Sequence, residues 1–290
     1  MFIALRPEAV SEAADRLRSV VRRTRVVRSP ALSRIAGGDV LLKMEQEQVT
    51  GSFKVRGAFN ALSRLSPAAR ERGVVASSAG NHGLGVAYAA HALGIAATVF
   101  VPSNAPQVKR DGIAALGATL DTSQPHYDAA MDAAKRTAAS RGAIFINPCL
   151  GDDLIAGQGT VGLEILEDVP DTGTIVLPVG GGGLLGGIGS IVRHRAPAVA
   201  IHGAQSDRTA AMSRSLAAGR VTAIDVTPTI ADGLARQIDD EALDIGQHAL
   251  DGIATVSEAA IARAIGWLAH HHGVRAEGAG AVAVAALLER

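Results

Sequence analysis

The sequence predicts an α/β protein in which two interwoven lobes contain mainly parallel sheets covered by helices. Short apolar runs, typical of buried strands, alternate along the chain with segments of helical length and periodicity. This order produces parallel sheets with helices on both faces. The 290 residues, 48% of them hydrophobic, suffice for a large core. Because no repeat, low-complexity tract or long linker divides the sequence, we expect the lobes to share segments.

The elements are expected in the following order. Residues 8–28 have the apolar spacing of an amphipathic helix and its exit, and 39–45 form a run typical of a strand. Later strands are expected, from apolar runs between turn residues, at 73–76, 96–101, 143–147, 174–179 and 199–204. Later helices are expected, from their periodicity and end signals, at 81–93, 107–116, 127–140, 157–168 and 207–217. In such a fold, loops at the carboxyl ends of the strands form the binding surface.

Composition limits the kinds of molecule that the protein is expected to bind and the cellular compartment in which it is expected. Lys plus Arg and Asp plus Glu both number 28, so net charge favours neither nucleic acid nor an acidic membrane. A small neutral or zwitterionic substrate fits this balance better. The single cysteine, Cys149, cannot form an internal disulfide, and Arg6 and Glu8 place charge too early for a secretory signal. We therefore expect a cytoplasmic protein without a membrane span.

Lys54 is the candidate reactive residue. It lies within 49–60, where a glycine-containing turn leads into an apolar helix and Arg56 supplies a second cation. Partly apolar surroundings and a nearby cation disfavour the charged amine, which makes it a usable nucleophile for Schiff-base chemistry. A surface lysine at a helix start is the alternative, and this segment alone does not decide between the two.

Residues 77–83, Ser-Ser-Ala-Gly-Asn-His-Gly, lie between an expected strand and an expected helix. Their small side chains let a ligand approach the backbone, and Ser78 with the amides of the helix start can bind a carboxylate. Asn81 offers both a donor and an acceptor. The alternative is an ordinary turn in which Asn81 is the helix N-cap.

Residues 178–185 contain four consecutive glycines between a strand and a helix, an arrangement that suits a bound phosphate. The same segment contains a GxGxxG string at Gly181, Gly183 and Gly186, which also occurs in nicotinamide-binding proteins. That class needs an acidic residue near the end of the next strand, and the best-placed residue is Gln205. A P-loop is excluded because its lysine is missing.

Together the three segments resemble the fold-type II pyridoxal-phosphate enzymes, in the threonine/serine dehydratase and serine racemase branch. The resemblance extends from about Val26 to the C-terminus. Further matching segments are 43–45, 156–160, 230–233 and 277–281. The resemblance implies a tryptophan-synthase-β-like fold, with a large cofactor-binding domain at 1–73 and 149–290 and a small domain, 74–148, inserted in it.

The resemblance implies pyridoxal 5′-phosphate as the cofactor. Lys54 would form the Schiff base and remove the Cα proton of the substrate, Phe53 would pack on the ring, and Asn81 would bond the ring hydroxyl. The residues implied to hold the phosphate are Gly180, Gly181, Gly182, Gly183 and Leu184. The residues implied to line the ring are Gly233 and Glu277. The residues implied to bind the substrate are Ser78, Ala79, Gly80, Asn81 and His82.

The implied reaction is β-elimination, in which a lyase of amino-acid metabolism converts threonine or serine to a 2-oxo acid and ammonia. His82 favours this reaction over β-replacement, because cysteine-synthase-like relatives usually have a threonine after the asparagine. Racemisation needs a second acid–base group on the opposite ring face, and Ala79 stands where racemases use a serine. A racemase, a β-replacement enzyme and a catalytically weak or inactive cofactor-binding relative remain the alternatives.

The expected partners are a small amino-acid substrate and a second copy in a homodimer, with no nucleic acid and no membrane. We expect no metal site, because Gln205 and Ala211 stand where related enzymes use a glutamate and an aspartate. Family members continue past a helix at 281–288 into a strand whose turn bonds the pyridine nitrogen, whereas this sequence ends at Arg290. The resemblance implies either that this sequence is a truncated version of a longer protein or that the pyridine nitrogen has another partner, such as water. We therefore expect weak cofactor binding and slow turnover.

Overall fold

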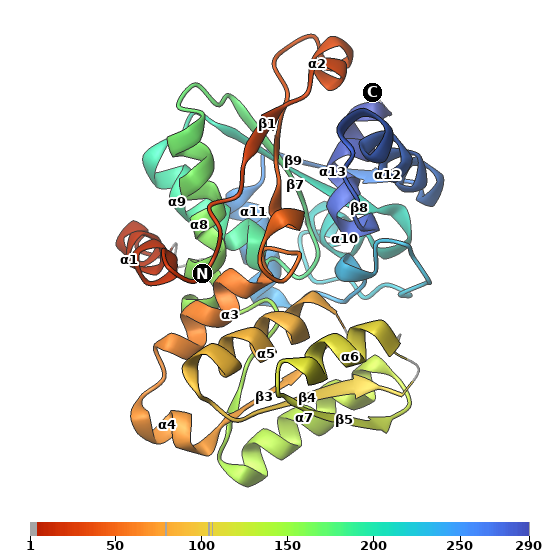
Figure 1. The fold of residues 1–290 in the computed structure, drawn as a ribbon. Coiled ribbons are helices and arrows are strands. Elements are labelled where there is room, and N and C mark those ends of the chain that lie inside the picture. The colour runs from red at the N-terminus through yellow and green to blue at the C-terminus, as the bar shows by residue number, and fades with distance from the viewer. Residues whose placement is uncertain (1–4, 79, 104, 106, 290) are drawn as a thin grey trace. The chain divides into compact units, whose positions relative to one another are not determined.

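The computed structural model describes residues 5–78, 80–103, 105 and 107–289 (Figure 1). By their internal contacts the residues form two compact units. The first unit contains Met1–Val10, Arg23–Gln46 and Gly159–Arg290, and the second contains Ser11–Arg22 and Glu47–Gln158. The chain passes repeatedly from one unit to the other, which confirms the prediction of interwoven lobes.

The second unit is built on a four-stranded parallel sheet. Its strands, in spatial order, are β5 (Thr119–Gln124), β4 (Ala97–Pro102), β3 (Val74–Ser77) and β6 (Ile144–Phe145). The accompanying helices are α3 (Lys54–Ser63), α4 (Pro67–Arg72), α5 (Asn81–Leu93), α6 (Gln107–Ala115) and α7 (Tyr127–Arg141). The two central strands, β4 and β3, are largely apolar and buried on both faces, as strands of parallel sheets covered by helices are.

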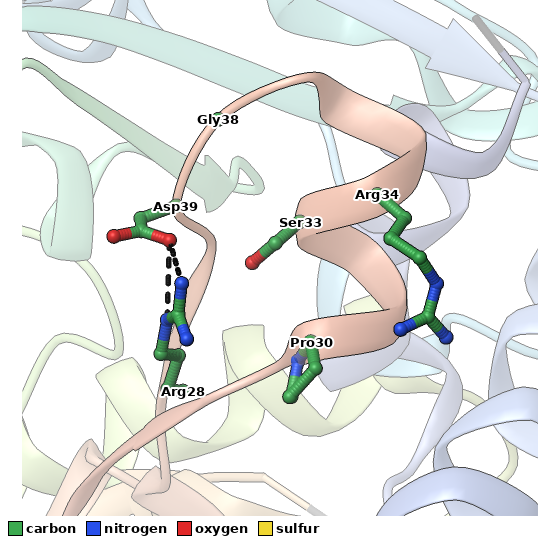
Figure 2. A pocket seen from close by; sticks show the side chains of 6 residues that line it. All are labelled: Arg28, Pro30, Ser33, Arg34, Gly38 and Asp39. Atoms are coloured by element: carbon green, nitrogen blue, oxygen red, sulfur yellow. Dashed lines mark hydrogen bonds and ion pairs between the residues drawn. The ribbon is translucent and has the colours of Figure 1, made fainter.

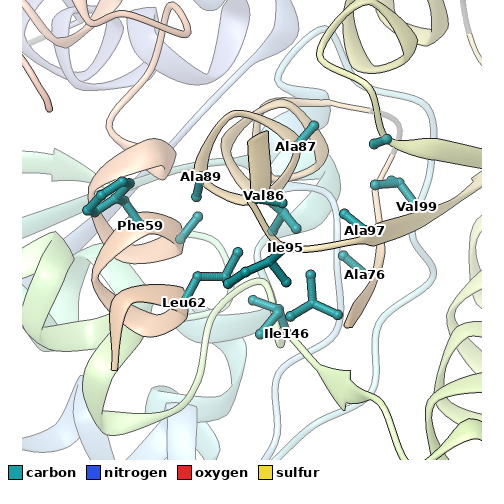
Figure 3. Packing of buried hydrophobic residues seen from close by; sticks show 14 of the residues in the cluster. Phe59, Leu62, Ala76, Val86, Ala87, Ala89, Ile95, Ala97, Val99 and Ile146 are labelled. Carbon is teal, nitrogen blue, oxygen red and sulfur yellow. The ribbon is translucent and has the colours of Figure 1, made fainter. Parts of the chain in front are cut away.

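Alternate residues of β3 belong to two different hydrophobic clusters. Val74 and Ala76 pack in the larger cluster with side chains of α3 and α5, such as Leu62 and Val86 (Figure 3). Val75 belongs to a smaller cluster with alanines of α7. Side chains of a strand point alternately to opposite faces, so the sheet separates α3 and α5 from α7.

The first unit contains a three-stranded parallel sheet. Its strands, in spatial order, are β7 (Thr174–Pro178), β8 (Ala200–Ser206) and β9 (Gly252–Val256). The longer helices of this unit are α9 (Gly183–Arg195), α10 (Ala211–Ala218), α11 (Asp240–Ala249), α12 (Glu258–His272) and α13 (Gly278–Leu288). Residues of β8, β9, α12 and α13 form one hydrophobic core. None of the described helices combines the length and apolar character that crossing a bilayer requires.

The N-terminal region differs from the expectation. The range 8–28, expected to contain a helix and its exit, contains two elements: α1 spans Pro7–Leu17, and Val26–Arg28 form strand β1. This strand pairs antiparallel with β2 (Leu41–Lys43). Its two valines favour a strand, but the partner strand lies further along the chain and the periodicity of residues 8–28 does not indicate it. Helix α2 (Pro30–Ala36) joins the two strands.

A solvent-open recess of about 350 Å³ lies on this β1–α2–β2 segment and is lined by Arg28, Pro30, Ser33, Arg34, Gly38 and Asp39 (Figure 2). The Arg28 guanidinium binds the Asp39 carboxylate across it. Ser33 Oγ donates to Ser29 O and accepts from Val40 N. Arg28 and Asp39 bind each other and Ser33 bonds to backbone groups, so these three side chains hold the β1–α2–β2 segment together.

Candidate active site

Lys54 is the first residue of α3 and lies in the second unit. The preceding turn contains Gly51 at φ 77°, in the left-handed region that favours glycine. Ser52 Oγ accepts a hydrogen bond from Lys54 N at 3.3 Å, which satisfies one of the amides left open at a helix start. The side-chain Nζ donates to Pro148 O at 2.8 Å and lies 5.2 Å from the centroid of the Phe53 ring. The amine is therefore held by a carbonyl and an aromatic face.

Pro148 is a participant that the sequence did not indicate. Asn147 Oδ1 accepts hydrogen bonds from Cys149 N at 2.9 Å and Leu150 N at 3.0 Å. This turn, which an asparagine side chain makes with its own backbone, fixes the carbonyl that binds Lys54. The Asn-Pro dipeptide after a strand is a turn signal, but it does not reveal what the turn holds.

The segment expected to bind substrate follows β3 in the same unit. Ser78 N donates to Phe100 O at 3.1 Å, and Gly80 N donates to Ser78 Oγ at 3.1 Å. Asn81 then begins α5, whose 13 residues direct the positive end of the helix dipole at this segment. Ala79, the position that bears on racemisation, lies outside the described residues.

His82 is buried rather than exposed on this segment. Its Nε2 lies 3.1 Å from Ile146 O, and because a carbonyl only accepts, Nε2 carries the proton. The ring thereby ties α5 to the chain that continues into Pro148. A Cβ on Gly85 would lie 3.1 Å from the Lys54 carbonyl carbon, so α5 also packs directly on the start of α3. Within this unit, the structure brings the turn of α3, the start of α5 and Pro148 together.

The glycine segment lies in the first unit, where β7 leads into α9. Gly182 has φ 86°, which only glycine adopts readily, and α9 begins at Gly183. A Cβ on Gly180 would lie 3.2 Å from Leu234 Cα, so the backbone runs close to the neighbouring turn. Leu184 follows within α9 and is half-buried. Bare backbone with amides at the start of a 13-residue helix suits an anionic group.

Gly233 and Glu277 lie near this segment in the same unit. Gly233 belongs to a 3₁₀ turn, Asp232–Leu234, and its backbone carbonyl lies 3.6 Å from where a Cβ on Gly180 would stand. A Cβ on Gly233 would lie 3.8 Å from Glu277 Oε1. The structure therefore places these two residues beside the glycine segment.

Glu258, which the sequence analysis did not single out, anchors the chain that leads to Gly233. Its carboxylate accepts from Ser206 Oγ and Thr229 Oγ1, both at 2.6 Å, and from Ile230 N at 2.7 Å. Partial desolvation raises the pKa of Glu258, but the hydrogen bonds from Ser206, Thr229 and the Ile230 amide together hold it below its ordinary value. A carboxylate that accepts several hydrogen bonds favours its charged form.

We expect Glu258→Gln to destabilise the protein by about 1–3 kcal/mol at neutral pH, the cost of losing charged hydrogen bonds. Because the folded-state pKa is lowered, the stabilisation is present above the unfolded value of about 4.3 and is lost as pH falls through the folded value. The difference in Tm between wild type and variant should shrink below about pH 4. Exposed Glu71 supplies the control Glu71→Gln, which should change Tm little. A difference that persists undiminished in acid would contradict this account.

Gln205 bears on the nicotinamide alternative. Its side chain is 1% exposed, donates from Nε2 to Val179 O at 2.9 Å and accepts at Oε1 from Ser213 N at 3.0 Å. Both ends are occupied by backbone groups, so the side chain does not present an acceptor to ribose hydroxyls.

Across the part of the chain that the structure describes, no three His, Cys, Asp or Glu side chains gather as metal ligands.

Comparison with known proteins shows the family to which the chain is similar. A family model described as pyridoxal-phosphate dependent enzyme matches residues 17–290. L-threonine ammonia-lyase of Thermotoga maritima is 44% identical over 98% of this chain and 71% of that protein. Maize serine racemase superposes with a TM-score of 0.94 at 32% identity, covering 98% of this chain and 89% of that one. Threonine deaminase isoform 2 of Solanum lycopersicum gives a TM-score of 0.92 at 31% identity, covering 97% and 79%.

Proposed function

This chain belongs to the family of pyridoxal-phosphate dependent enzymes, and we propose that it is an ammonia-lyase that converts threonine or serine to a 2-oxo acid and ammonia. The observation that carries the proposal is the 44% identity to an L-threonine ammonia-lyase over 98% of this chain. The same family contains the serine racemase fold neighbour, so the reaction type has to be tested directly.

The residues present fit the cofactor. Lys54 ends in an amine held 2.8 Å from a carbonyl beside an aromatic ring, which suits a lysine that must be directed at an aldehyde. The glycine segment leaves helix-start amides beside bare backbone, which suits a phosphate. We propose that Lys54 holds the cofactor covalently, with Phe53 and Asn81 against its ring, and that Gly180 to Leu184 bind its phosphate.

Bound pyridoxal phosphate supplies an electron sink that stabilises negative charge at Cα of an amino acid. In our proposal Lys54 Nζ takes the Cα proton, and its Pro148 acceptor fixes the direction from which the amine acts. Ser78, Gly80 and the first amides of α5 bind the substrate carboxylate, aided by the helix dipole. His82, buried against Ile146 O, holds that segment in place, and Gly233 and Glu277 line the ring.

We expect purified protein loaded with pyridoxal phosphate to release ammonia and a 2-oxo acid from L-threonine or L-serine, with little D-serine. The measurement is a panel of β-hydroxy amino acids, including 3-hydroxyaspartate, assayed for ammonia, 2-oxo acid and enantiomer. D-serine that accumulates from L-serine faster than pyruvate would assign a racemase instead. Cofactor binding without turnover of any panel member would assign an inactive relative.

Three further expectations stay proposals. They are the division into a large domain, 1–73 and 149–290, with an inserted domain, 74–148; a homodimer; and a cytoplasmic location. All four strands of the second unit's sheet fall within 74–148, which supports the first of them.

A further inference from the structure

The first turn of the helix that carries Lys54 combines a 3₁₀-type backbone hydrogen bond with a hydrogen bond to a side chain of another helix. In a regular α-helix Gly57 N would donate to Phe53 O, four residues earlier. Here Phe53 O accepts from Arg56 N at 3.0 Å, and Gly57 N donates to Oε1 of Gln158 at 3.2 Å. The residue that precedes the helix, Phe53, occupies the N-cap position and contributes no side-chain cap. The first turn of α3 is therefore completed by a side chain from another helix, α8 (Asp152–Asp168).

Gln158 has little freedom to move because α3 and α8 are in backbone contact around it. A Cβ on Gly57 would lie 2.3 Å from Gln158 Nε2 and 2.6 Å from Leu154 O. A Cβ on Gly157 would lie 2.5 Å from Arg56 O. The Gln158 side chain is 1% exposed, so its amide is fixed by packing in the position where Oε1 reaches Gly57 N.

The two ends of the Gln158 amide differ. Oε1 accepts from Gly57 N, whereas Nε2 is buried with no hydrogen-bond partner among the residues that the structure describes. A buried donor without an acceptor is unfavourable, and an apolar side chain of similar size would avoid it. The useful end of the side chain is thus the oxygen that holds the first turn of α3.

We propose that Gln158 is a positioning residue for Lys54, because its Oε1 holds the first turn of α3 and so sets the direction in which the lysine side chain leaves the helix. This inference rests on the proposed function in one respect, that Lys54 is the lysine that captures the cofactor aldehyde. It does not depend on which amino acid is the substrate.

The test compares two ligands that share ring and phosphate but differ at the aldehyde: pyridoxal phosphate and 4′-deoxypyridoxine 5′-phosphate. For Gln158→Leu we expect the Kd of pyridoxal phosphate to rise roughly tenfold, as loss of one orienting hydrogen bond allows. The Kd of the deoxy analogue should stay within about twofold, because phosphate and ring contacts are unchanged. Gln158→Glu should restore pyridoxal phosphate binding, because a carboxylate oxygen accepts the same bond and is favoured at a helix N-terminus.

Asn60→Leu is the matched control. Asn60 is fully buried on α3, donates from Nδ2 to Asp153 O of α8 at 2.6 Å and accepts from Arg16 Nε at 2.8 Å. Its loss breaks a contact between the same two helices without touching the first turn of α3. We expect a lower Tm for this variant, as for Gln158→Leu, but no selective loss of pyridoxal phosphate binding.

Several outcomes would overturn the proposal. One is that Gln158→Leu raises the Kd of both ligands equally. Another is that Asn60→Leu also weakens pyridoxal phosphate binding selectively. A third is that Gln158→Glu does not restore pyridoxal phosphate binding. Borohydride fixation of the cofactor to a lysine other than Lys54 would overturn it together with the proposed cofactor lysine. A different outcome would contradict the proposed reaction alone. It is a protein in which Gln158→Leu weakens only pyridoxal phosphate binding and borohydride fixes the cofactor to Lys54, but which releases no ammonia from any amino acid.

Discussion

Lys54→Ala is expected to lower kcat at least about 10³-fold, because the amine that moves the Cα proton is removed. The fold should survive the change. Loss of the bond from Nζ to Pro148 O costs about 0.5–1.5 kcal/mol, and alanine is the best helix former at the residue where α3 begins. Ammonia release and Tm, measured on the same preparation, separate the two effects.

Lys135→Ala supplies the control for this substitution. Lys135 is exposed on α7, so its loss should leave both activity and Tm unchanged. Borohydride should fix the cofactor to a peptide that contains Lys54 in the wild type and in the control. Ammonia release from Lys54→Ala above about a tenth of the wild-type rate would show that another group takes the proton.

Where the signals were local, the sequence predicted the structure well. The expected helix 81–93 agrees with α5, because Gly80 and Gly94 bound it and Gly94 adopts the left-handed conformation that ends a helix. The apolar runs predicted parallel strands, and both larger sheets are parallel. The glycine segment follows β7 and opens α9, as expected from its composition.

Features that depend on distant partners could not be predicted. Strand β5 (Thr119–Gln124) is largely polar and is a strand only because it pairs with the edge of β4. The strand expected at 143–147 shortens to β6, since β3 pairs with just two of its residues. The acceptor of Lys54, Pro148 O, is 94 residues away in the chain, and no local pattern connects the two.

Helix α8 shows why a glycine can mislead. The sequence predicts a helix over 157–168, with its start at Gly157. The structure instead begins the helix at Asp152 and continues it through Gly157. The glycine is there because α3 approaches so closely that a Cβ would lie 2.5 Å from Arg56 O and 2.6 Å from Gly57 Cα.

Gly157→Ala is therefore expected to destabilise the protein strongly, although the same change favours an isolated helix. All three of the nearest atoms belong to the backbone of α3, so no flexible side chain can move aside. Overpacking of this kind costs about 3 kcal/mol, and the better helix propensity of alanine returns about 1 kcal/mol at most. We expect Tm to fall by roughly 5 °C or more in thermal unfolding.

Gly266→Ala is the control with the opposite sign. Gly266 lies inside α12, is exposed, and a Cβ there would meet nothing within 4 Å. Alanine should therefore add only its helix propensity, stabilising the protein by about 0.5–1 kcal/mol. If both substitutions raise Tm, α3 and α8 can separate without loss, and close contact at Gly157 is not what fixes the helix that carries Lys54. The two substitutions are chemically identical. If Tm falls for Gly157→Ala and rises for Gly266→Ala, the close contact between α8 and α3 is therefore the reason that residue 157 must be glycine.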